Sequence, residues 1–291
     1  MDKLTSVSNL RNIFRERGLA PNKKLGQSFL VDAAVLRKIT DAIELSPDDH
    51  VLEIGPGTGT LTEALAERAR SVMTIELDRG LFSLLEERFS GRENVRLVHA
   101  DVLRCDLESL LESWLPPGCR LTKVVSNLPY CITTPVIEKF LRLRPSPECL
   151  IFTVQKELAE RLTASSGSRT YGRLTIMVNY FSRPETLFTI GRGAFWPRPR
   201  VDSALVAFRT GAPPRAAVKD ESLFFALVKA AFHQRRRMLR NSLLQFVGGE
   251  CLAEALGRAG LEPTLRPERL SVEDFARLAD AICDLRGDDH E

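Results

Sequence analysis

The chain has 291 residues, a net charge of +3 and an apolar fraction of 44%, which is enough for one large domain and a small one with an ordinary core. No run approaches the roughly twenty apolar residues of a membrane-spanning helix, which excludes a helical integral membrane protein. Six cysteines and four histidines are scattered without a CxxC pair or a histidine cluster. We therefore expect neither a metal site nor a disulfide framework, and free thiols fit the reducing cytosol.

The N-terminal extension, residues 1–24, is basic and amphipathic and lacks the apolar core of a secretory signal. Asp2 and Glu16 argue against a transit peptide, so we expect a cytoplasmic protein. Basic residues are concentrated at 11–24, 183–215 and 229–240. Each of these stretches is as compatible with a solvated surface as with an anionic partner.

Short apolar runs alternate with helical patterns from residue 50 onward. Strands are predicted at 50–55, 71–77, 95–101, 122–127, 149–155, 174–181 and 202–209, and helices at 60–69, 80–89, 135–143 and 156–164. This alternation predicts an α/β fold with a Rossmann-like, largely parallel sheet and helices on both faces. In such a fold the ligand binds beyond the carboxyl ends of the strands.

The composition changes near residue 210. Residues 210–218, TGAPPRAAV, are rich in Pro and Ala without either periodicity and predict a linker. Helical spacing follows at 221–246, 251–260 and 271–285. We therefore expect a ligand-binding α/β domain over 1–209 and a small all-helical domain over 210–291.

The first predicted strand runs into a glycine loop, with glycines at positions 55, 57 and 59. Glycines between a strand and a helix let the backbone approach a ligand and aim the helix N-terminus at it. The dinucleotide fingerprint would place its third glycine at position 60, which is Thr60. The GxGxG spacing is instead typical of enzymes that use S-adenosylmethionine, although packing alone is an alternative reason for such glycines.

Acidic residues end the next two predicted strands. Glu76 lies seventeen residues after Gly59, where a carboxylate can accept hydrogen bonds from two ribose hydroxyls. Asp101, followed by Val102, ends the third strand, where an acid can accept from an adenine amino group. Either acid alone is as readily a surface residue, but three features at consecutive strand ends favour one cofactor site.

The fourth predicted strand ends in Asn127-Leu128-Pro129-Tyr130. Adenine N6 is a poor nucleophile, so an enzyme must direct its lone pair at the methyl donor. The Asn127 oxygen and a carbonyl at Leu128 or Pro129 could accept the two N6 hydrogens, and proline fixes that carbonyl's direction. Tyr130 would stack on a flipped base. The alternative is a plain turn after a strand.

At this point the sequence resembles the KsgA-type small-subunit rRNA adenine dimethyltransferases over nearly its whole length. The resemblance is carried by KKLGQSFLVD (23–32), EIGPGTGTLT (53–62), IELD around Glu76, HADVL (99–103), SNLPYCITTPVI (126–137), FTVQKELAERL (152–162), YGRLTI (171–176), AFWPRPRVDSAL (194–205) and FHQRRRMLRNSL (232–243).

The resemblance implies S-adenosylmethionine as the methyl donor and two adjacent adenines, near the 3′ end of small-subunit rRNA, as the substrate. The implied or expected cofactor contacts are Ser28, Leu30, Gly55, Gly57, Gly59, Glu76, Asp101, Val102 and Asn127. Phe195 resembles the family's second aromatic, which stacks on the base opposite Tyr130. The chain departs from the family at Ser28, where Asn or His is usual, and a side-chain contact there is left open.

Arg235, Arg236, Arg237 and Arg240 follow an apolar helical pattern. Three consecutive arginines on a helix spread over most of its circumference, and Arg240 returns to the face of Arg236 and Arg237. We expect about half of them to pair with carboxylates and the others to contact RNA phosphates. We also expect a monomer that acts on small-subunit rRNA or its pre-ribosomal particle.

Three other functions compete with this one. A macrolide-resistance (Erm) methyltransferase uses the same chemistry on large-subunit rRNA, but NLPY and the extended helical tail favour the small subunit. A DNA adenine methyltransferase would share only the NLPY-like motif. A non-catalytic ribosome-assembly factor would have no need of Asn127, Glu76 and Asp101.

Overall fold

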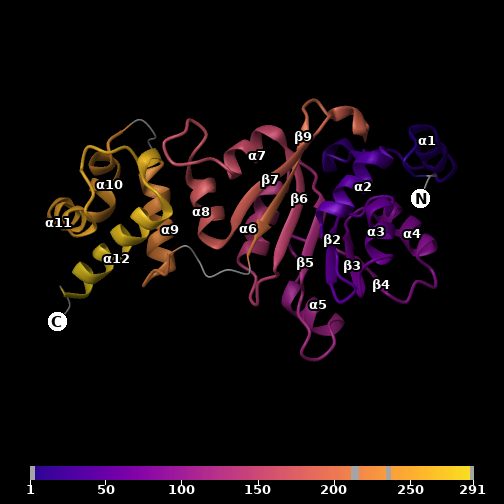
Figure 1. Cartoon of the computed structure of the whole chain (residues 1–291), viewed down its shortest axis with the longest axis horizontal. Helices are drawn as coiled ribbons and strands as arrows, with labels where there is room; N and C mark the ends of the chain where they lie inside the picture. The colour runs from indigo at the N-terminus through magenta and orange to yellow at the C-terminus, as the bar shows by residue number, and fades with distance from the viewer. Residues whose placement is uncertain (1–3, 211–215, 234–236, 289–291) are drawn as a thin grey trace. The chain divides into compact units, whose positions relative to one another are not determined.

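The computed structural model describes residues 4–210, 216–233 and 237–288. The chain divides into two compact units (Figure 1). The first comprises Met1–Ala159 and Glu185–Gly211, and the second comprises Glu160–Pro184 and Ala212–Glu291. The later boundary lies close to the one expected from composition at 209/210, but residues 160–184 group with the helical unit as well.

A mixed seven-stranded sheet forms the centre of the first unit. Its order is β4 (Val95–His99), β3 (Ser71–Glu76), β2 (His50–Ile54), β5 (Lys123–Asn127), β6 (Cys149–Gln155), β9 (Ser203–Arg209) and β7 (Arg183–Ile190). The pairs β2–β3, β3–β4, β2–β5 and β5–β6 are parallel, and β6–β9 is antiparallel. The predicted α/β class is therefore confirmed.

The strand order reverses at β2, since β3 pairs on one side of it and β5 on the other. Ligands of open α/β sheets bind at such a switch point, beyond the carboxyl ends of the strands. Val51, Leu52 and Val124 at this point are fully buried, because both faces of a parallel sheet are covered.

Helices connect these strands and precede them. They are α1 (Val7–Glu16), η1 (Lys23–Leu25), α2 (Ala33–Ala42), α3 (Thr60–Ala66), α4 (Arg79–Arg88), α5 (Leu107–Trp114), α6 (Thr133–Leu141) and α7 (Lys156–Leu162). Aspartates start several of them: the side chains of Asp32, Asp78 and Asp106 accept from backbone N–H groups in the first turns of α2, α4 and α5. These caps mark the starts of α2 and α5, which apolar periodicity did not predict.

A small N-terminal subassembly packs beside the main sheet. β1 (Phe29–Leu30) pairs antiparallel with β8 (Phe195–Trp196), which follows η2 (Arg192–Ala194). Phe14 of α1 lies edge-on to Phe29 and Trp196, with ring centroids 5.2 and 5.4 Å away. This aromatic cluster holds the N-terminal segment against Trp196, which lies far later in the chain.

Residues 174–181 correct one prediction. This segment was predicted as a strand but lies in helix α8 (Arg173–Phe181). A continuous apolar run does not distinguish a buried strand from a buried helix by periodicity. In the second unit Tyr180 packs on Phe224 of α9 (Glu221–Ala231), with ring centroids 4.8 Å apart, so α8 is buried by a helix that comes later in the chain. The next strand is β7, which directly follows α8. It was not predicted because its sequence is largely polar.

The second unit is helical, with α8, α9 (Glu221–Ala231), α10 (Leu239–Val247), α11 (Gly249–Ala259), η3 (Pro267–Arg269) and α12 (Val272–Asp288). The helical spacing noted at 221–246 spans two helices, because α9 ends at Ala231 and α10 begins at Leu239. Met238 has extended backbone, and the Leu239 N–H donates to the Leu265 carbonyl (2.7 Å). In the part of the chain that the structure describes, no helix has the length and apolarity to cross a membrane.

Gly59 begins α3 and should tolerate no side chain. Its φ is +79°, and an added Cβ would lie 2.6 Å from the Phe89 ring and 2.9 Å from Leu85. Gly118 has the same φ but faces open space. Alanine costs roughly 1–2 kcal/mol at either position for the left-handed backbone, and overpacking adds roughly 1–3 kcal/mol at Gly59.

We therefore expect Gly59→Ala to lower the free energy of unfolding by roughly 1–3 kcal/mol more than Gly118→Ala does. Urea titration of both variants measures this difference. Equal losses in the two variants would show that the contact with Phe89 does not constrain position 59.

Candidate active site

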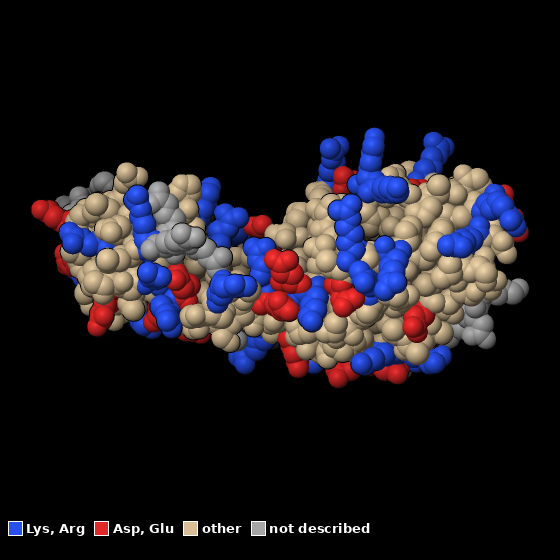
Figure 2. All heavy atoms as spheres, turned by 90° about the horizontal axis from the view of Figure 1, so that it is seen from above, with Lys and Arg blue, Asp and Glu red and all other residues tan. Residues whose placement is uncertain are grey.

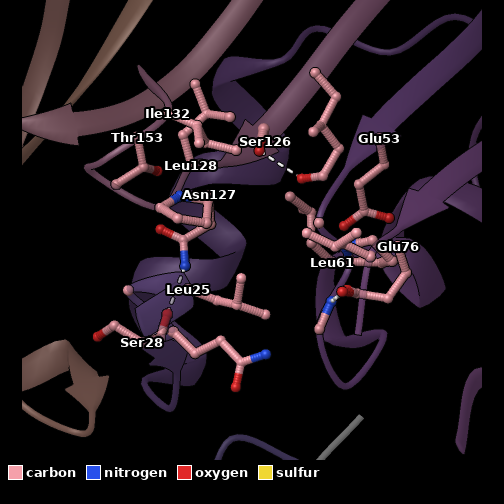
Figure 3. Close-up of a pocket in the computed structure, with 18 of the residues that line it drawn as sticks. Leu25, Ser28, Glu53, Leu61, Glu76, Ser126, Asn127, Leu128, Ile132 and Thr153 are labelled. Carbon is pink, nitrogen blue, oxygen red and sulfur yellow. Dashed lines mark hydrogen bonds between the residues drawn. The ribbon is translucent and has the colours of Figure 1, made fainter. Parts of the chain in front are cut away.

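A cavity of about 190 Å³ lies at the carboxyl ends of β2, β3 and β5 (Figure 3). The sequence-predicted residues that line it are Ser28, Leu30, Gly55, Gly57, Glu76, Asp101, Val102, Asn127, Leu128, Pro129, Tyr130 and Phe195. Gly59 is not among the lining residues, because it packs against Phe89 and Leu85. The N-terminal residues 25–30 form part of the wall, so segments that are distant in sequence close around one space.

The glycine loop lines the cavity with residues 55–58. Gly55 and Gly57 have φ values of +63° and +61°, which only glycine adopts without strain. A Cβ on Gly57 would lie 3.0 Å from the Phe29 ring, whereas a Cβ on Gly55 would meet nothing within 4 Å. Gly57 therefore lets the N-terminal segment pack against the loop, and Gly55 leaves open space for a ligand.

Glu76 ends β3 and is only 5% exposed. One of its carboxylate oxygens accepts from the Gly57 N–H (3.1 Å) and the other from the Asp78 N–H (2.8 Å). Burial raises the pKa of this carboxyl, and the two N–H groups oppose that effect. Since each oxygen has two lone pairs, the fixed carboxylate can still accept from two ligand hydroxyls.

Glu53 is a cavity residue that sequence reasoning quoted but gave no role. It is 2% exposed, and its carboxyl accepts from the Thr62 hydroxyl at 2.5 Å. No cationic side chain pairs with it among the described residues, and burial raises its pKa to about 8. Figure 3 shows Glu53 and Glu76 on one wall of the cavity, opposite Asn127 and Ser28. The sequence did contain a signal for this role, because an acidic residue lies within an apolar strand just before a glycine loop.

Asp101 lies two residues beyond the end of β4 rather than at its last residue. Its carboxylate accepts from the Leu103 N–H (2.9 Å) and lies 3.6 Å from the Arg104 guanidinium. The turn that it caps places the buried Val102 against the cavity. This rim can therefore offer an apolar face beside an acceptor.

Asn127 is the last residue of β5 and points into the cavity. Its amide Nδ2 donates to the main-chain carbonyl of Ser28 (2.9 Å), shown by a dashed line in Figure 3. The amide oxygen has no hydrogen-bond partner among the described residues. The Ser28 hydroxyl donates to the Pro197 carbonyl (2.8 Å) and is thereby engaged away from Asn127.

The aromatic residues of the predicted site are held differently. The half-buried Tyr130 hydroxyl bonds to Ser203 Oγ (2.8 Å) on β9, a residue that sequence reasoning did not single out. Burial raises the pKa of Tyr130. Phe195 is 5% exposed and belongs to the core around Leu30 and Leu205, so it presents little of its ring to the cavity.

Two of the four arginines predicted to bind RNA are described by the structure. Arg235 and Arg236 fall outside the described residues. Arg237 is exposed between α9 and α10, and Arg240 is exposed in the first turn of α10. Neither pairs with a described carboxylate, so the expected pairing of about half of them is not seen for these two. Within the described ranges no group of His, Cys, Asp and Glu could hold a metal ion.

The cavity residues fit S-adenosylmethionine. Glu76 supplies a fixed acceptor for a diol, Leu77 and Val102 supply apolar surface for a flat base, and Glu53 is a buried acid without a cation. Such a cofactor, when bound, supplies a methyl group on a positively charged sulfur.

The chain matches the family model described as ribosomal RNA adenine dimethylase over residues 18–284. It is 43% identical to the ribosomal RNA small subunit methyltransferase A of Moorella thermoacetica, covering 96% of this chain and 98% of that one. The protein of the same name from Geobacillus thermodenitrificans is 41% identical, covering 97% and 98%.

Two solved structures resemble most of the chain. A dimethyladenosine transferase from Plasmodium falciparum gives a TM-score of 0.74 at 26% identity and covers 86% of this chain and 95% of that one. The 23S rRNA methyltransferase ErmE gives 0.68 at 30% identity, covering 88% and 99%.

Glu53 should make stability depend on pH. In the unfolded chain this carboxyl ionises near its ordinary pKa of 4.5, whereas the folded protein holds the proton up to about pH 8. Its contribution to folding is therefore fully present below pH 4.5 and is lost as the pH rises toward 8.

We expect Glu53→Gln, which cannot ionise, to gain stability relative to the parent as the pH rises from about 5 to 8. Urea unfolding at several pH values measures this difference, and Glu93→Gln on the surface controls for the loss of a carboxylate. A difference that does not change with pH would mean that Glu53 is ionised in the folded protein.

Proposed function

The chain belongs to the ribosomal RNA adenine dimethylase family, and from this membership we propose that it dimethylates N6 of two adjacent adenines in the 3′-terminal hairpin of small-subunit rRNA. It is an S-adenosylmethionine-dependent methyltransferase with the Rossmann-like fold of that family. The observation that carries the proposal is the position of Asn127. Its amide oxygen faces the cavity across from Glu76 and Glu53 and has no partner among the residues that the structure describes.

The chemistry at N6 follows from what Asn127 and the adjoining backbone can accept. The Asn127 oxygen and the carbonyl of Leu128 or Pro129 would take the two N6 hydrogens and direct the nitrogen lone pair across the cavity. No general base is needed, because the amine becomes acidic only after it has gained a methyl group. Rate then depends on positioning and on preorganised acceptors. Tyr130, and Phe195 if its ring becomes accessible, would stack on the base.

The small subunit is favoured over the large one by the relatives. Those at 41–43% identity over nearly the full length are named for the small subunit, whereas ErmE, named for 23S rRNA, is 30% identical. The same names support an rRNA substrate, and we propose that it is presented in a pre-ribosomal small subunit. We further propose that the protein acts as a monomer in the cytoplasm.

The helical unit is proposed to bind RNA. On the face in Figure 2, Lys and Arg side chains project from both units. Arg237 and Arg240 are exposed and pair with no described carboxylate, so their charges are available to phosphates. Arg235 and Arg236 extend the same basic sequence. Phosphate contacts would position a hairpin without reading its sequence.

The test of function is methyl transfer to isolated small subunits that lack this modification, with mass spectrometry of the rRNA. We expect two N6,N6-dimethyladenines in the 3′-terminal hairpin. Asn127→Ala should lower turnover about a hundredfold or more, because one preorganised acceptor is lost, while calorimetry shows that binding of S-adenosylmethionine is largely retained. Methylation of large-subunit RNA instead, or only monomethyladenine after exhaustive reaction, would contradict the proposal.

Replacing Arg235, Arg236, Arg237 and Arg240 by Gln tests the RNA-binding role. We expect weaker binding to the small subunit and a flatter salt dependence, by roughly 0.7–0.9 in log–log slope for each lost phosphate contact. Cofactor affinity is the internal control and should not change, because the cavity is formed by the first unit alone. A folded variant with the parent's affinity and salt slope would exclude these arginines from RNA binding.

A further inference from the structure

Ser28 makes two hydrogen bonds that join three segments of the first unit. Its main-chain carbonyl accepts from Asn127 Nδ2 (2.9 Å), and its hydroxyl donates to the Pro197 carbonyl (2.8 Å). Asn127 ends β5, Ser28 precedes β1, and Pro197 follows β8. One residue therefore connects the N-terminal segment to the proposed catalytic amide and to the strand that carries Phe195.

The first of these bonds decides which way the Asn127 amide faces. An asparagine amide has one end that donates and one that accepts, and the two have nearly the same shape. A carbonyl can bond only the donating end. With Nδ2 held by Ser28, Oδ1 is the end left for the cavity. Without this partner the amide could turn, and an N–H would then face the amine that Asn127 must accept from.

The second bond fixes the position of the Ser28 carbonyl itself. Ser28 stands just before the two-residue pairing of Phe29 with Trp196 and Leu30 with Phe195. So short a ladder gives little restraint beyond its own residues. The hydroxyl bond to Pro197 extends the connection by one more residue on each strand, so the carbonyl that meets Asn127 is held from both sides.

We propose that Ser28 is a positioning residue for methyl transfer, acting through Asn127 rather than through a side-chain contact with the cofactor. The proposal rests on the proposed function of Asn127. The N-terminal segment then has two roles. It lines the cavity, and it sets the direction of the Asn127 amide that accepts from the substrate amine.

The variants Ser28→Ala and Ser28→Thr test the hydroxyl. Ser28→Ala keeps the carbonyl and loses the bond to Pro197, and we expect kcat to fall about tenfold because a supporting contact of a preorganised group is lost. Affinity for S-adenosylmethionine should stay within twofold of the parent. Ser28→Thr keeps a hydroxyl and should recover most of the rate.

Thr122→Val is the matched control. The Thr122 hydroxyl also donates to a main-chain carbonyl, that of His50 at 2.9 Å, but at the opposite end of the sheet. We expect this variant to keep the parent's kcat. Melting temperatures of all variants show whether a rate change reflects unfolding, and the side-chain amide signal of Asn127 in ¹⁵N spectra should shift in Ser28→Ala even where stability falls.

A double-mutant cycle with Asn127→Ala separates action through Asn127 from independent action. In that background Ser28→Ala should have no further effect on single-turnover rates, since residues acting as a unit are not additive. Additive losses, a cofactor affinity that falls with the rate, or an unchanged kcat in Ser28→Ala would each overturn the proposal. Failure of the parent chain to methylate small-subunit rRNA would instead refute the proposed function.

Discussion

The reversal of strand order at β2 is the constraint on which the rest of the site depends. Because β3 and β5 pair in parallel on either side of β2, the glycine loop, Glu76 and Asn127 emerge at one edge of the sheet. The backbone N–H of Gly57 then reaches the Glu76 carboxylate, and the Ser126 hydroxyl reaches the Ile54 carbonyl (2.5 Å), so the loop is bonded to both neighbouring strands. The loop and the two strand ends proposed to meet cofactor and substrate are thus tied to one another by hydrogen bonds.

Burial raises the pKa of both acids in this cavity, but their hydrogen-bond donors differ. Glu76 accepts from two backbone N–H groups, which favour its charged form against burial. Glu53 has only a hydroxyl donor and lies near a second carboxylate, so burial dominates and it retains its proton to about pH 8. The neighbouring Glu76 carboxylate adds to the effect of burial at Glu53, because like charges disfavour the second ionisation. A cationic ligand would change that balance, since it favours both charged forms.

The sequence predicted the parallel core and part of the cavity lining, because both depend on local patterns. Strands such as β3 and β6 are largely apolar runs of buried residues, and the glycine loop and NLPY have fixed places at strand ends. Partners contributed by distant segments were not predictable in this way. The bonds from Tyr130 to Ser203 and from Asn127 to Ser28 depend on tertiary packing across 73 and 99 residues. Residues 174–181 were misassigned for a related reason, because their burial is decided by contacts with α9 rather than by periodicity.

Residues 27–29 of the N-terminal segment contact both the glycine loop, where the cofactor is proposed to bind, and Asn127, which is proposed to accept from the substrate. Phe29 packs against Gly57 of the cofactor loop, and the neighbouring Ser28 carbonyl holds Asn127. Gln27, one residue earlier, donates to Asp78 (3.0 Å), whose N–H in turn bonds Glu76. Three consecutive residues therefore contact the glycine loop, the proposed acceptor Asn127 and the aspartate that bonds Glu76. Any displacement of residues 27–29 would disturb all three together, so we infer that an ordered N-terminal segment is a condition both for cofactor binding and for the correct direction of the Asn127 amide.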